Sequence, residues 1–384
     1  MATFYFIRVS KMKKIRILYT IPNFDTAGSG KALLNIALSL NKELFEAHIL
    51  CLNTKGTFFK EVEKSGVPIH IFNYLAKERP FYKMLFDCWK ISRKLKKINP
   101  DIIHSFNYTS NYTEAIAAKL AGIKWTFTKK NMSWGGSSKN SWKLRSLLAN
   151  KIIVQNREMR KQFYSNSSKT TLIPRGVFAE RFKKNLPDSK IKEQMNTLEN
   201  QRVLICVANF VPVKGIEVLI DAFHKVHKDN PNWVLWLVGD DQNDYGLQLK
   251  EKVKRFQLSD KIIFSGKQKD VTFYLNHAEI FILPTLDKGE GSPVALLEAM
   301  ANGKIVIGSK VAGIEDQLER FPLHLFTPKD NNELAQKLIH FMKKSKVELT
   351  EIGIQFTKMV NEKYTIEIEV LKHENFYHSF FNYK

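Results

Sequence analysis

Short runs of β-forming residues alternate with amphipathic helical stretches from one end of this chain to the other. In one helical stretch, apolar residues recur at intervals of three and four: Leu33, Leu34, Ile36, Ala37 and Leu40. This is the spacing of a helix that buries one face, and buried parallel strands joined by such helices produce the alternation. The sequence therefore predicts an α/β fold throughout.

The expected strands fall into two series, separated by a charged stretch at Lys183–Ser189. The first series is Ile15–Tyr19, His48–Leu52, Pro68–Ile71, Ile102–Ser105, Trp125–Thr128, Ile152–Val154 and Thr171–Ile173. The second is Val203–Val207, Trp233–Val238, Ile262–Ser265, Ile280–Leu283 and Ile305–Gly308. Each series predicts a Rossmann-like, doubly wound parallel sheet, and ligands bind such sheets at the carboxyl ends of their strands.

The length of 384 residues suffices for two domains of about 150–200 residues each, which excludes a single small binding module. We expect one domain at residues 1–185 and a second at 186–360, with the strand ends of both around a central cleft. A tail at 361–384 follows, and the aromatic residues of Phe376–Tyr383 predict that it packs back on the first domain.

The net charge of +22 lies entirely in the first 200 residues, which hold 36 Lys and Arg against 14 Asp and Glu. Residues 201–384 hold 24 of each sign. One half that faces an anionic surface and another that handles a small molecule would produce this asymmetry. A generally lysine-rich composition is the alternative.

The chain has no apolar run near the roughly 18–20 residues that a bilayer crossing needs, so we expect it at most to lie on a membrane. Met1–Ser10 lacks the features of a secretion signal, and Met12 could equally be the natural start. The three cysteines, Cys51, Cys88 and Cys206, form neither a disulfide framework nor a zinc motif. A reducing cytoplasm fits this usage best.

Two glycines, Gly28 and Gly30, close the loop after the first strand, and a helix is expected to begin at Lys31. Free backbone N–H groups at a helix start suit an anionic group. The spacing matches neither a dinucleotide fingerprint nor an ATPase phosphate loop. A tight strand-to-helix turn without a ligand is the alternative.

In the second half, Lys214 stands at the entrance of a helix that follows the strand Val203–Val207 and the loop residue Asn209. A cation there opposes the helix dipole unless an anionic ligand shares the position, although a solvated surface lysine is also possible. Gly239 and Asp240 end another strand, where a glycine lets a ligand approach.

Two glutamates eight residues apart, Glu290 and Glu298, form the most specific pattern. Glu290 lies in a glycine-flanked loop with Gly291, and Ser292 and Pro293 suit the N-cap and first turn of the following helix. Glu298 lies on that helix in apolar company, where ribose hydroxyls would be suitable partners. An exposed position on the helix is the alternative.

These motifs, together with Pro174–Val177, resemble the family 4 glycosyltransferases, which are retaining enzymes with the two-domain GT-B fold, over nearly the whole chain. The resemblance implies an acceptor-side first domain and a nucleotide-sugar donor domain second. It implies that Glu290 contacts the donor sugar, Glu298 holds the ribose, and Lys214 neutralises the diphosphate. It also implies that the N–H groups of Gly291 and Ser292 help to stabilise the diphosphate, and that no bound metal or other cofactor is needed.

The chain departs from the family pattern at three positions. Asn209 stands where the family usually has an arginine, and Arg175, in place of an asparagine, is a conceivable substitute. Lys130 takes the place of a first-domain histidine and could donate a hydrogen bond to the donor. His104, at the end of the preceding strand, is expected to face the cleft, although a lone histidine there is more often structural.

The stretch Phe81–Ile98 predicts a basic, aromatic helix that could lie on an anionic membrane, with an ordinary core-facing helix as the alternative. A second basic stretch, Ser133–Lys151, suggests an acceptor-side loop. Together they favour a glycan or polyprenyl-linked acceptor, as in bacterial surface polysaccharide assembly.

The predicted activity is sugar transfer from a nucleoside-diphosphate-sugar to an acceptor hydroxyl, and we expect it in the cytoplasm, with a peripheral position on the inner face of the plasma membrane as an option. A sugar-nucleotide epimerase of the same fold is one alternative. A basic nucleic-acid-binding protein is another, but the chain has no zinc finger, RNA-recognition signature or zipper, so we expect no nucleic-acid partner.

Overall fold

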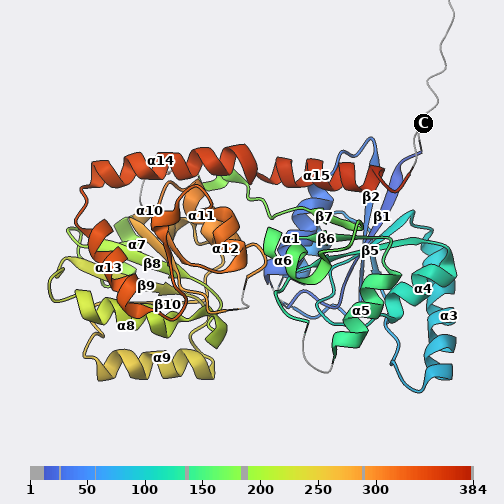
Figure 1. The fold of residues 1–384 in the computed structure, drawn as a ribbon, viewed down its shortest axis with the longest axis horizontal. Helices are drawn as coiled ribbons and strands as arrows, with labels where there is room; N and C mark the ends of the chain where they lie inside the picture. Colours follow the sequence, from blue (N-terminus) through green and yellow to red (C-terminus); the bar gives the residue numbers. More distant parts are fainter. Residues whose placement is uncertain are drawn as a thin grey trace, which may run out of the picture. The chain divides into compact units, whose positions relative to one another are not determined.

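The computed structural model of the chain describes residues 13–25, 27–56, 58–134, 138–182, 189–287 and 290–381 (Figure 1). Several features of the sequence lie outside these residues: Met1–Ser10 and Met12, Gly135 and Gly136 in the second basic stretch, most of the charged stretch at Lys183–Ser189, Gly289 beside Glu290, and the tail beyond residue 381. Within the described part, no helix has both the length and the apolar character needed to cross a bilayer.

The first sheet has seven strands in the order β3-β2-β1-β4-β5-β6-β7. They are β1 (Ile15–Ile21), β2 (Phe45–Cys51), β3 (Ile69–Ile71), β4 (Ile102–Ser105), β5 (Lys124–Lys129), β6 (Lys151–Val154) and β7 (Thr170–Leu172). Its helices are α1 (Ala27–Ser39), α2 (Phe59–Lys64), α3 (Phe81–Ile98), α4 (Thr113–Ala121), α5 (Lys139–Leu148) and α6 (Arg157–Tyr164). The chain order reverses between β1 and β4, which are parallel neighbours.

The second sheet has six strands in the order β10-β9-β8-β11-β12-β13. They are β8 (Arg202–Val207), β9 (Trp233–Val238), β10 (Ile262–Gly266), β11 (Ile280–Leu283), β12 (Ile305–Ser309) and β13 (Leu325–Phe326). The helices from residue 189 onward are α7 (Ser189–Gln194), α8 (Ile216–Val226), α9 (Asp244–Arg255), α10 (Thr272–His277), α11 (Val294–Ala301), α12 (Ala312–Gln317), α13 (Asn331–Met342), α14 (Lys346–Lys363) and α15 (Ile366–His378). Short 3-10 helices occupy Ala179–Phe182, Pro212–Lys214 and Pro322–His324.

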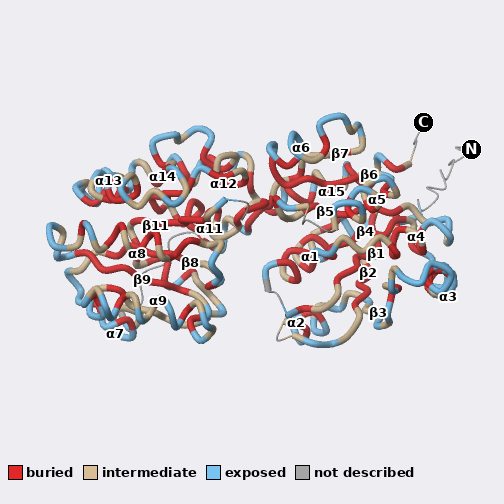
Figure 2. The backbone as a smooth tube through the Cα atoms, turned by 60° about the horizontal axis from the view of Figure 1, so that its bottom comes forward, coloured by how far each residue is buried: buried red, intermediate tan, exposed pale blue. Residues whose placement is uncertain are grey.

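Both sheets are parallel and Rossmann-like, which confirms the predicted fold class. Figure 2 shows the central strands as buried, and every side chain of β9 and β11 is buried. Burial on both faces explains why these strands read as continuous apolar runs. The two-residue strand β13 was missed because a pair of residues carries no periodicity.

The chain forms two compact units. The first comprises residues 1–128, 134–153 and 370–384, and the second comprises 129–133 and 154–369. Helix α15 passes from one to the other along the chain. The predicted domains, residues 1–185 and 186–360 with a tail at 361–384, have other boundaries than these units. They remain a prediction about which segments fold together.

Within the first unit, α15 packs on the sheet through a buried chain of polar groups. The Tyr377 hydroxyl lies 2.7 Å from Nδ1 of His104 and donates to the Tyr19 hydroxyl over 3.0 Å. Nε2 of His104 lies 2.8 Å from Oγ1 of Thr128. His104 and Tyr377 have no exposed surface. This corrects the expectation that His104 faces a cleft, because its ring is covered by α15.

We predict that Tyr377→Phe lowers the free energy of unfolding by about 1–3 kcal/mol, since it removes a buried hydrogen-bond partner from His104. Urea unfolding monitored by circular dichroism would measure the change. Tyr82→Phe, at a 77% exposed position, is the matched control and should leave stability unchanged. Equal stability of both variants would contradict a stabilising role for this contact.

Candidate functional site

The loops at the carboxyl ends of β8 and β11 carry Lys214 and Glu290, two of the residues that the sequence singled out in the second unit. These strands are neighbours at the point where the strand order of the sheet reverses. Ligands of open α/β sheets bind at such switch points, because the connections leave the two strands in opposite directions and open a crevice. The loop after β8 carries Lys214, and the loop after β11 carries Glu290.

The two loops are tied together by backbone contacts. The N–H of Leu286 donates to the carbonyl oxygen of Val213 over 2.8 Å. Gly215, the N-cap of α8, has a φ of +62°, and a Cβ atom there would lie 2.2 Å from the carbonyl oxygen of Pro284. Only glycine therefore lets the loop that presents Lys214 pass so close to the loop after β11.

Lys214 and Glu290 form an ion pair, in which Nζ of Lys214 donates to Oε1 of Glu290. The hydroxyl of Thr285 donates to the same oxygen over 2.9 Å. Glu290 is 7% exposed, so its carboxylate is held by two donors in a largely dry position. Thr285, which precedes the glutamate loop and had no role assigned from the sequence, is fully buried and fixes the orientation of the carboxylate.

Asn156 is a second residue that sequence reasoning missed, and it holds the backbone of the glutamate loop. Its Oδ1 accepts from the N–H of Met159 over 2.6 Å and so caps α6. Its Nδ2 donates to the carbonyl oxygen of Gly291 over 2.7 Å. The sequence alone could have indicated that Asn156 is an N-cap. It could not indicate the contact with Gly291, because that contact joins residues 135 positions apart.

Gly291 lies where neighbouring segments leave no room for a side chain. A Cβ atom there would lie 2.3 Å from the carbonyl oxygen of Lys130, and one at Gly313 would lie 2.5 Å from the carbonyl oxygen of Gly291. The structure thus brings the backbone of Lys130 beside the glutamate loop. The Lys130 side chain is half-buried, and its proposed contact with a donor stays a prediction.

Ser292 and Pro293 differ from their expected roles in the helix start. Pro293 is the N-cap of α11, and no side chain hydrogen-bonds to this cap. The Ser292 hydroxyl instead accepts from the N–H of Arg175 and from Nε2 of Gln317, each over 3.1 Å. Ser292 therefore joins three segments of the unit and does not cap the helix, which corrects the expectation.

Arg175 pairs with a carboxylate of its own unit. Its Nε lies 3.2 Å from Oε1 of Glu369, and both residues are buried. The other oxygen of Glu369 accepts from the N–H of Gly176 over 2.7 Å. Any contact of Arg175 with a diphosphate, as the sequence suggested, would have to share the guanidinium with Glu369.

The other predicted residues of the second unit lie around the same strand ends. Gly239 packs tightly on the loop after β8, since a Cβ atom there would lie 2.1 Å from the carbonyl oxygen of Ala208. Asn209 and Asp240 are exposed. Glu298 is half-buried on the second turn of α11. These positions are consistent with a ligand site at this edge, and the role of each stays a prediction.

In the first unit, Gly28 and Gly30 lie inside the first turn of α1, which begins at Ala27 and not at Lys31. Gly28 is exposed, with open space where a side chain would be. Gly30 is buried, and a Cβ atom there would lie 2.7 Å from the ring of Phe24. Gly30 therefore allows the helix to pack closely against Phe24, whereas Gly28 leaves the start of the helix open.

Part of the second basic stretch belongs to the core and not to a surface loop. Trp142 and Arg145 are buried on α5, and Arg145 donates to the carbonyl oxygen of Asn111 over 2.6 Å. The cysteines are buried as well, and burial raises the pKa of the Cys206 thiol to about 12 and those of Cys51 and Cys88 to about 11. They remain protonated at neutral pH and are poor nucleophiles.

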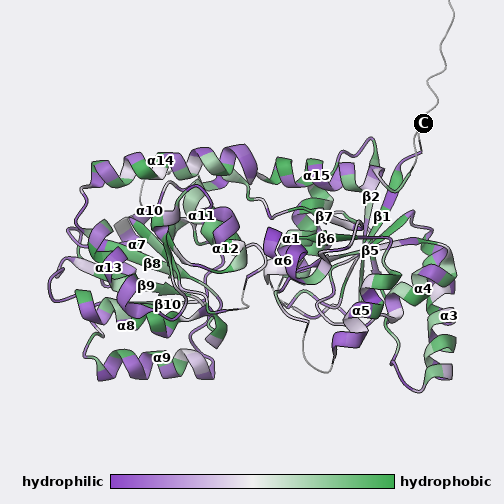
Figure 3. Ribbon diagram, viewed as in Figure 1, coloured by the Kyte–Doolittle hydropathy of each residue, from purple (hydrophilic) through white to green (hydrophobic). Residues whose placement is uncertain are grey.

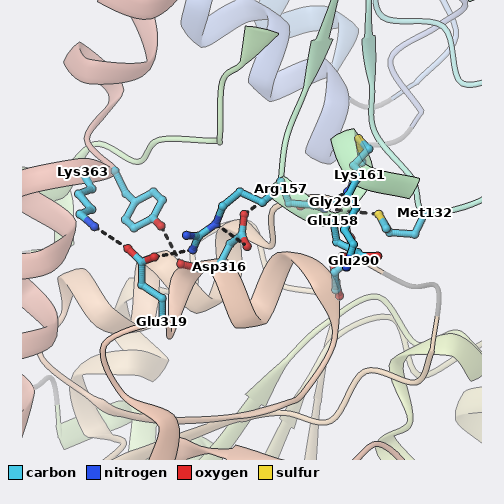
Figure 4. A network of polar contacts seen from close by, with 12 residues as sticks. Met132, Arg157, Glu158, Lys161, Glu290, Gly291, Asp316, Glu319 and Lys363 are labelled. Carbon is cyan, nitrogen blue, oxygen red and sulfur yellow. Dashed lines mark hydrogen bonds and ion pairs between the residues drawn. The ribbon is translucent and has the colours of Figure 1, made fainter. Parts of the chain in front are cut away.

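An ion network beside Asn156 fixes α6 against α12 (Figure 4). Arg157 bonds Asp316 through its backbone N–H over 2.8 Å and through Nε over 3.2 Å, and its Nη2 also bonds Glu319. Hydrogen bonds from Lys363 and Arg157 lower the pKa of Glu319. The network holds the N-terminus of α6 in place, and with it the Asn156 amide.

We predict that Asn156→Ala lowers the free energy of unfolding by about 1–2 kcal/mol, as the loss of an N-cap does, and also loosens the glutamate loop. Hydrogen exchange should then accelerate at the amides of residues 290–293. Ser345→Ala, which removes the N-cap of α14, is the matched control. It should cost similar stability without faster exchange in this loop. Unchanged exchange in Asn156→Ala would contradict the proposed clamp.

Two family models match this chain, and together they span most of it. Residues 26–181 match the model described as Glycosyltransferase Family 4, and residues 187–355 match that of Glycosyl transferases group 1. Helix α1 and the Glu290 and Lys214 loops fall within the matched ranges.

Two curated relatives and one solved structure illustrate the similarity. The capsular polysaccharide biosynthesis glycosyltransferase CapH of Staphylococcus aureus is 25% identical over 77% of this chain and 82% of its own. An Escherichia coli protein named UDP-Gal:alpha-D-GlcNAc-diphosphoundecaprenol alpha-1,3-galactosyltransferase is 27% identical over 63% of this chain and 66% of its own. Anabaena HepE, solved in complex with UDP and glucose, superposes with a TM-score of 0.80 at 20% identity, covering 95% of this chain and 100% of that one. With both sheets and both family models in agreement, this chain belongs to the family 4 glycosyltransferases with the GT-B fold.

Proposed function

We propose that this glycosyltransferase moves a sugar from a nucleoside-diphosphate-sugar to a hydroxyl of a glycan or lipid-linked acceptor, with retention at the anomeric carbon. The observation that carries the proposal is the contact between Lys214 and Glu290 at the switch point of the second sheet. It joins a cation that can neutralise a diphosphate to a carboxylate that can bind sugar hydroxyls.

In the proposed reaction, the bond between the anomeric carbon and the diphosphate oxygen breaks while the acceptor oxygen bonds to the same carbon. The acceptor hydroxyl proton leaves with the diphosphate, so charge and atoms balance. Negative charge grows on the leaving diphosphate, and Lys214 is placed to share its positive charge between that group and Glu290. Glu290 orients the donor sugar, and Glu298 binds the ribose.

The relatives support this class of substrate. The name of the Escherichia coli protein specifies a UDP-sugar donor and a diphosphoundecaprenol-linked acceptor, and that of the Staphylococcus protein specifies capsular polysaccharide biosynthesis. We therefore place this reaction in bacterial surface polysaccharide assembly, in the cytoplasm and at the inner face of the plasma membrane. The solved UDP complex of HepE makes UDP the first nucleotide to test.

Donor binding can be measured as thermal stabilisation of the purified chain by UDP, GDP, ADP and their sugars. We predict that one nucleotide series stabilises the second unit by about 2.7 kcal/mol at 100 times its dissociation constant. Glu298→Ala and Lys214→Gln should lose most of this shift, whereas Glu351→Ala, at an exposed position of α14, should keep it. If no nucleotide stabilises the wild type up to millimolar concentrations, the donor site is refuted.

Turnover tests the role of Glu290 separately from binding. We predict that Glu290→Gln keeps nucleotide stabilisation but lowers kcat by about a hundredfold or more, as the loss of one preorganised electrostatic group does. The anomeric configuration of the product, read by nuclear magnetic resonance, checks retention. An inverted product would contradict the proposed stereochemistry and leave the transferase activity standing.

A further inference from the structure

Helix α3 of the first unit buries one face and leaves the other unpartnered in the described structure. Met84, Cys88, Ile91 and Leu95 form the buried stripe, at the spacing of four, three and four residues that one helix face requires. The helix packs beside α4 through this stripe. This stripe is the part of α3 that packs into the core of the first unit. The residues on the opposite side take no part in that packing.

The side of α3 that faces away from this stripe carries aromatic rings. At about 100° per residue, Tyr82, Phe86 and Trp89 point away from the buried stripe. They are 77%, 54% and 49% exposed. A cluster of large apolar side chains in contact with water is unusual unless another surface covers it. Figure 2 shows α3 largely as exposed, and Figure 3 shows hydrophobic and hydrophilic residues mixed along it.

Cations surround these rings. The helix has six Lys and Arg residues but one acidic residue, Asp87. Lys90 lies over the ring of Phe86 at 4.3 Å, and Arg93 lies over that of Trp89 at 5.7 Å. Among the residues that the structure describes, none of the six forms an ion pair with a carboxylate. Their charge is therefore uncompensated by the protein and available to an anionic partner.

The same surface continues onto the edge of the first sheet. Lys94 lies 5.1 Å from the ring centre of Phe72, which directly follows the edge strand β3. Ile71, the last residue of that strand, is 50% exposed. The apolar and basic surface thus spans two elements and is wider than one helix.

We propose that this surface, made of the outer face of α3 and the end of β3, docks the protein on an anionic lipid bilayer. Rings at the level of the lipid headgroups with cations around them match such an interface, and α3 would lie in its plane. A nucleic-acid duplex would need the cations but not a cluster of exposed rings, and a protein partner would need fewer uncompensated charges. The proposal deepens the membrane location given above but does not depend on the donor or the acceptor.

Cosedimentation of the full chain with vesicles tests the proposal. Binding is expected to vesicles that contain phosphatidylglycerol, to weaken with salt, and to be absent with pure phosphatidylcholine. The triple variant Lys90→Gln, Arg93→Gln and Lys97→Gln should bind about a hundredfold more weakly, because each lost charge costs about fivefold in affinity. Phe86→Ser with Trp89→Ser should also weaken binding.

Matched controls lie on the second unit. Lys254→Gln with Arg255→Gln removes exposed charge from α9, and Phe273→Ser removes a 49% exposed ring from α10. Both should leave vesicle binding unchanged, and circular dichroism should show that every variant is folded. The proposal would be overturned if the control variants lost as much vesicle binding as the α3 variants, or if the wild type did not bind vesicles. It would also be overturned if the wild type were a dimer and only the α3 substitutions made it dissociate. Nucleotide stabilisation measured in the same variants keeps this outcome distinct from failure of the transferase function.

Discussion

The rest of this structure depends on the way in which its parallel strands must be connected. A parallel pair needs a crossover of a dozen or more residues, so each strand is followed by a helix and all carboxyl ends gather at one edge of the sheet. Where the order reverses between β8 and β11, two successive crossovers leave in opposite directions. Lys214 and Glu290 meet there although 76 residues separate them. The ion pair is thus a consequence of topology as much as of residue type.

The Lys214–Glu290 pair would be costly if it were only structural. A largely buried ion pair loses hydration, and its mutual attraction often fails to compensate. Here Thr285 supplies a further donor, and the backbone around Glu290 is held by Asn156. Such support limits the motion of the carboxylate, which is what a preorganised electrostatic site requires. The same arrangement leaves Lys214 19% exposed at its side chain and therefore within reach of a ligand.

The first unit combines a conventional core with an unusual surface. The buried side of α3 has the spacing of an ordinary amphipathic helix, but the outer side carries rings and cations that the fold does not use. This assigns part of the charge excess of the first 200 residues to one surface. Other basic residues of this half have structural roles, as Arg145 shows, since it is fully buried and hydrogen-bonded to the chain. Net charge alone could not separate the two groups.

The sequence by itself determined the fold class, the strands β4, β9 and β11 with their observed bounds, the full extent of α3, and the positions of Lys214 and Glu290 after strands. These features follow from local periodicity and from turn residues, and both depend only on residues that are close together in the sequence. Tertiary structure alone decided that His104 is covered by α15, that Ser292 bonds Arg175 and Gln317, and that Asn156 holds Gly291. Each of these contacts joins segments far apart in the sequence, and no local pattern encodes which distant group will satisfy a buried polar atom.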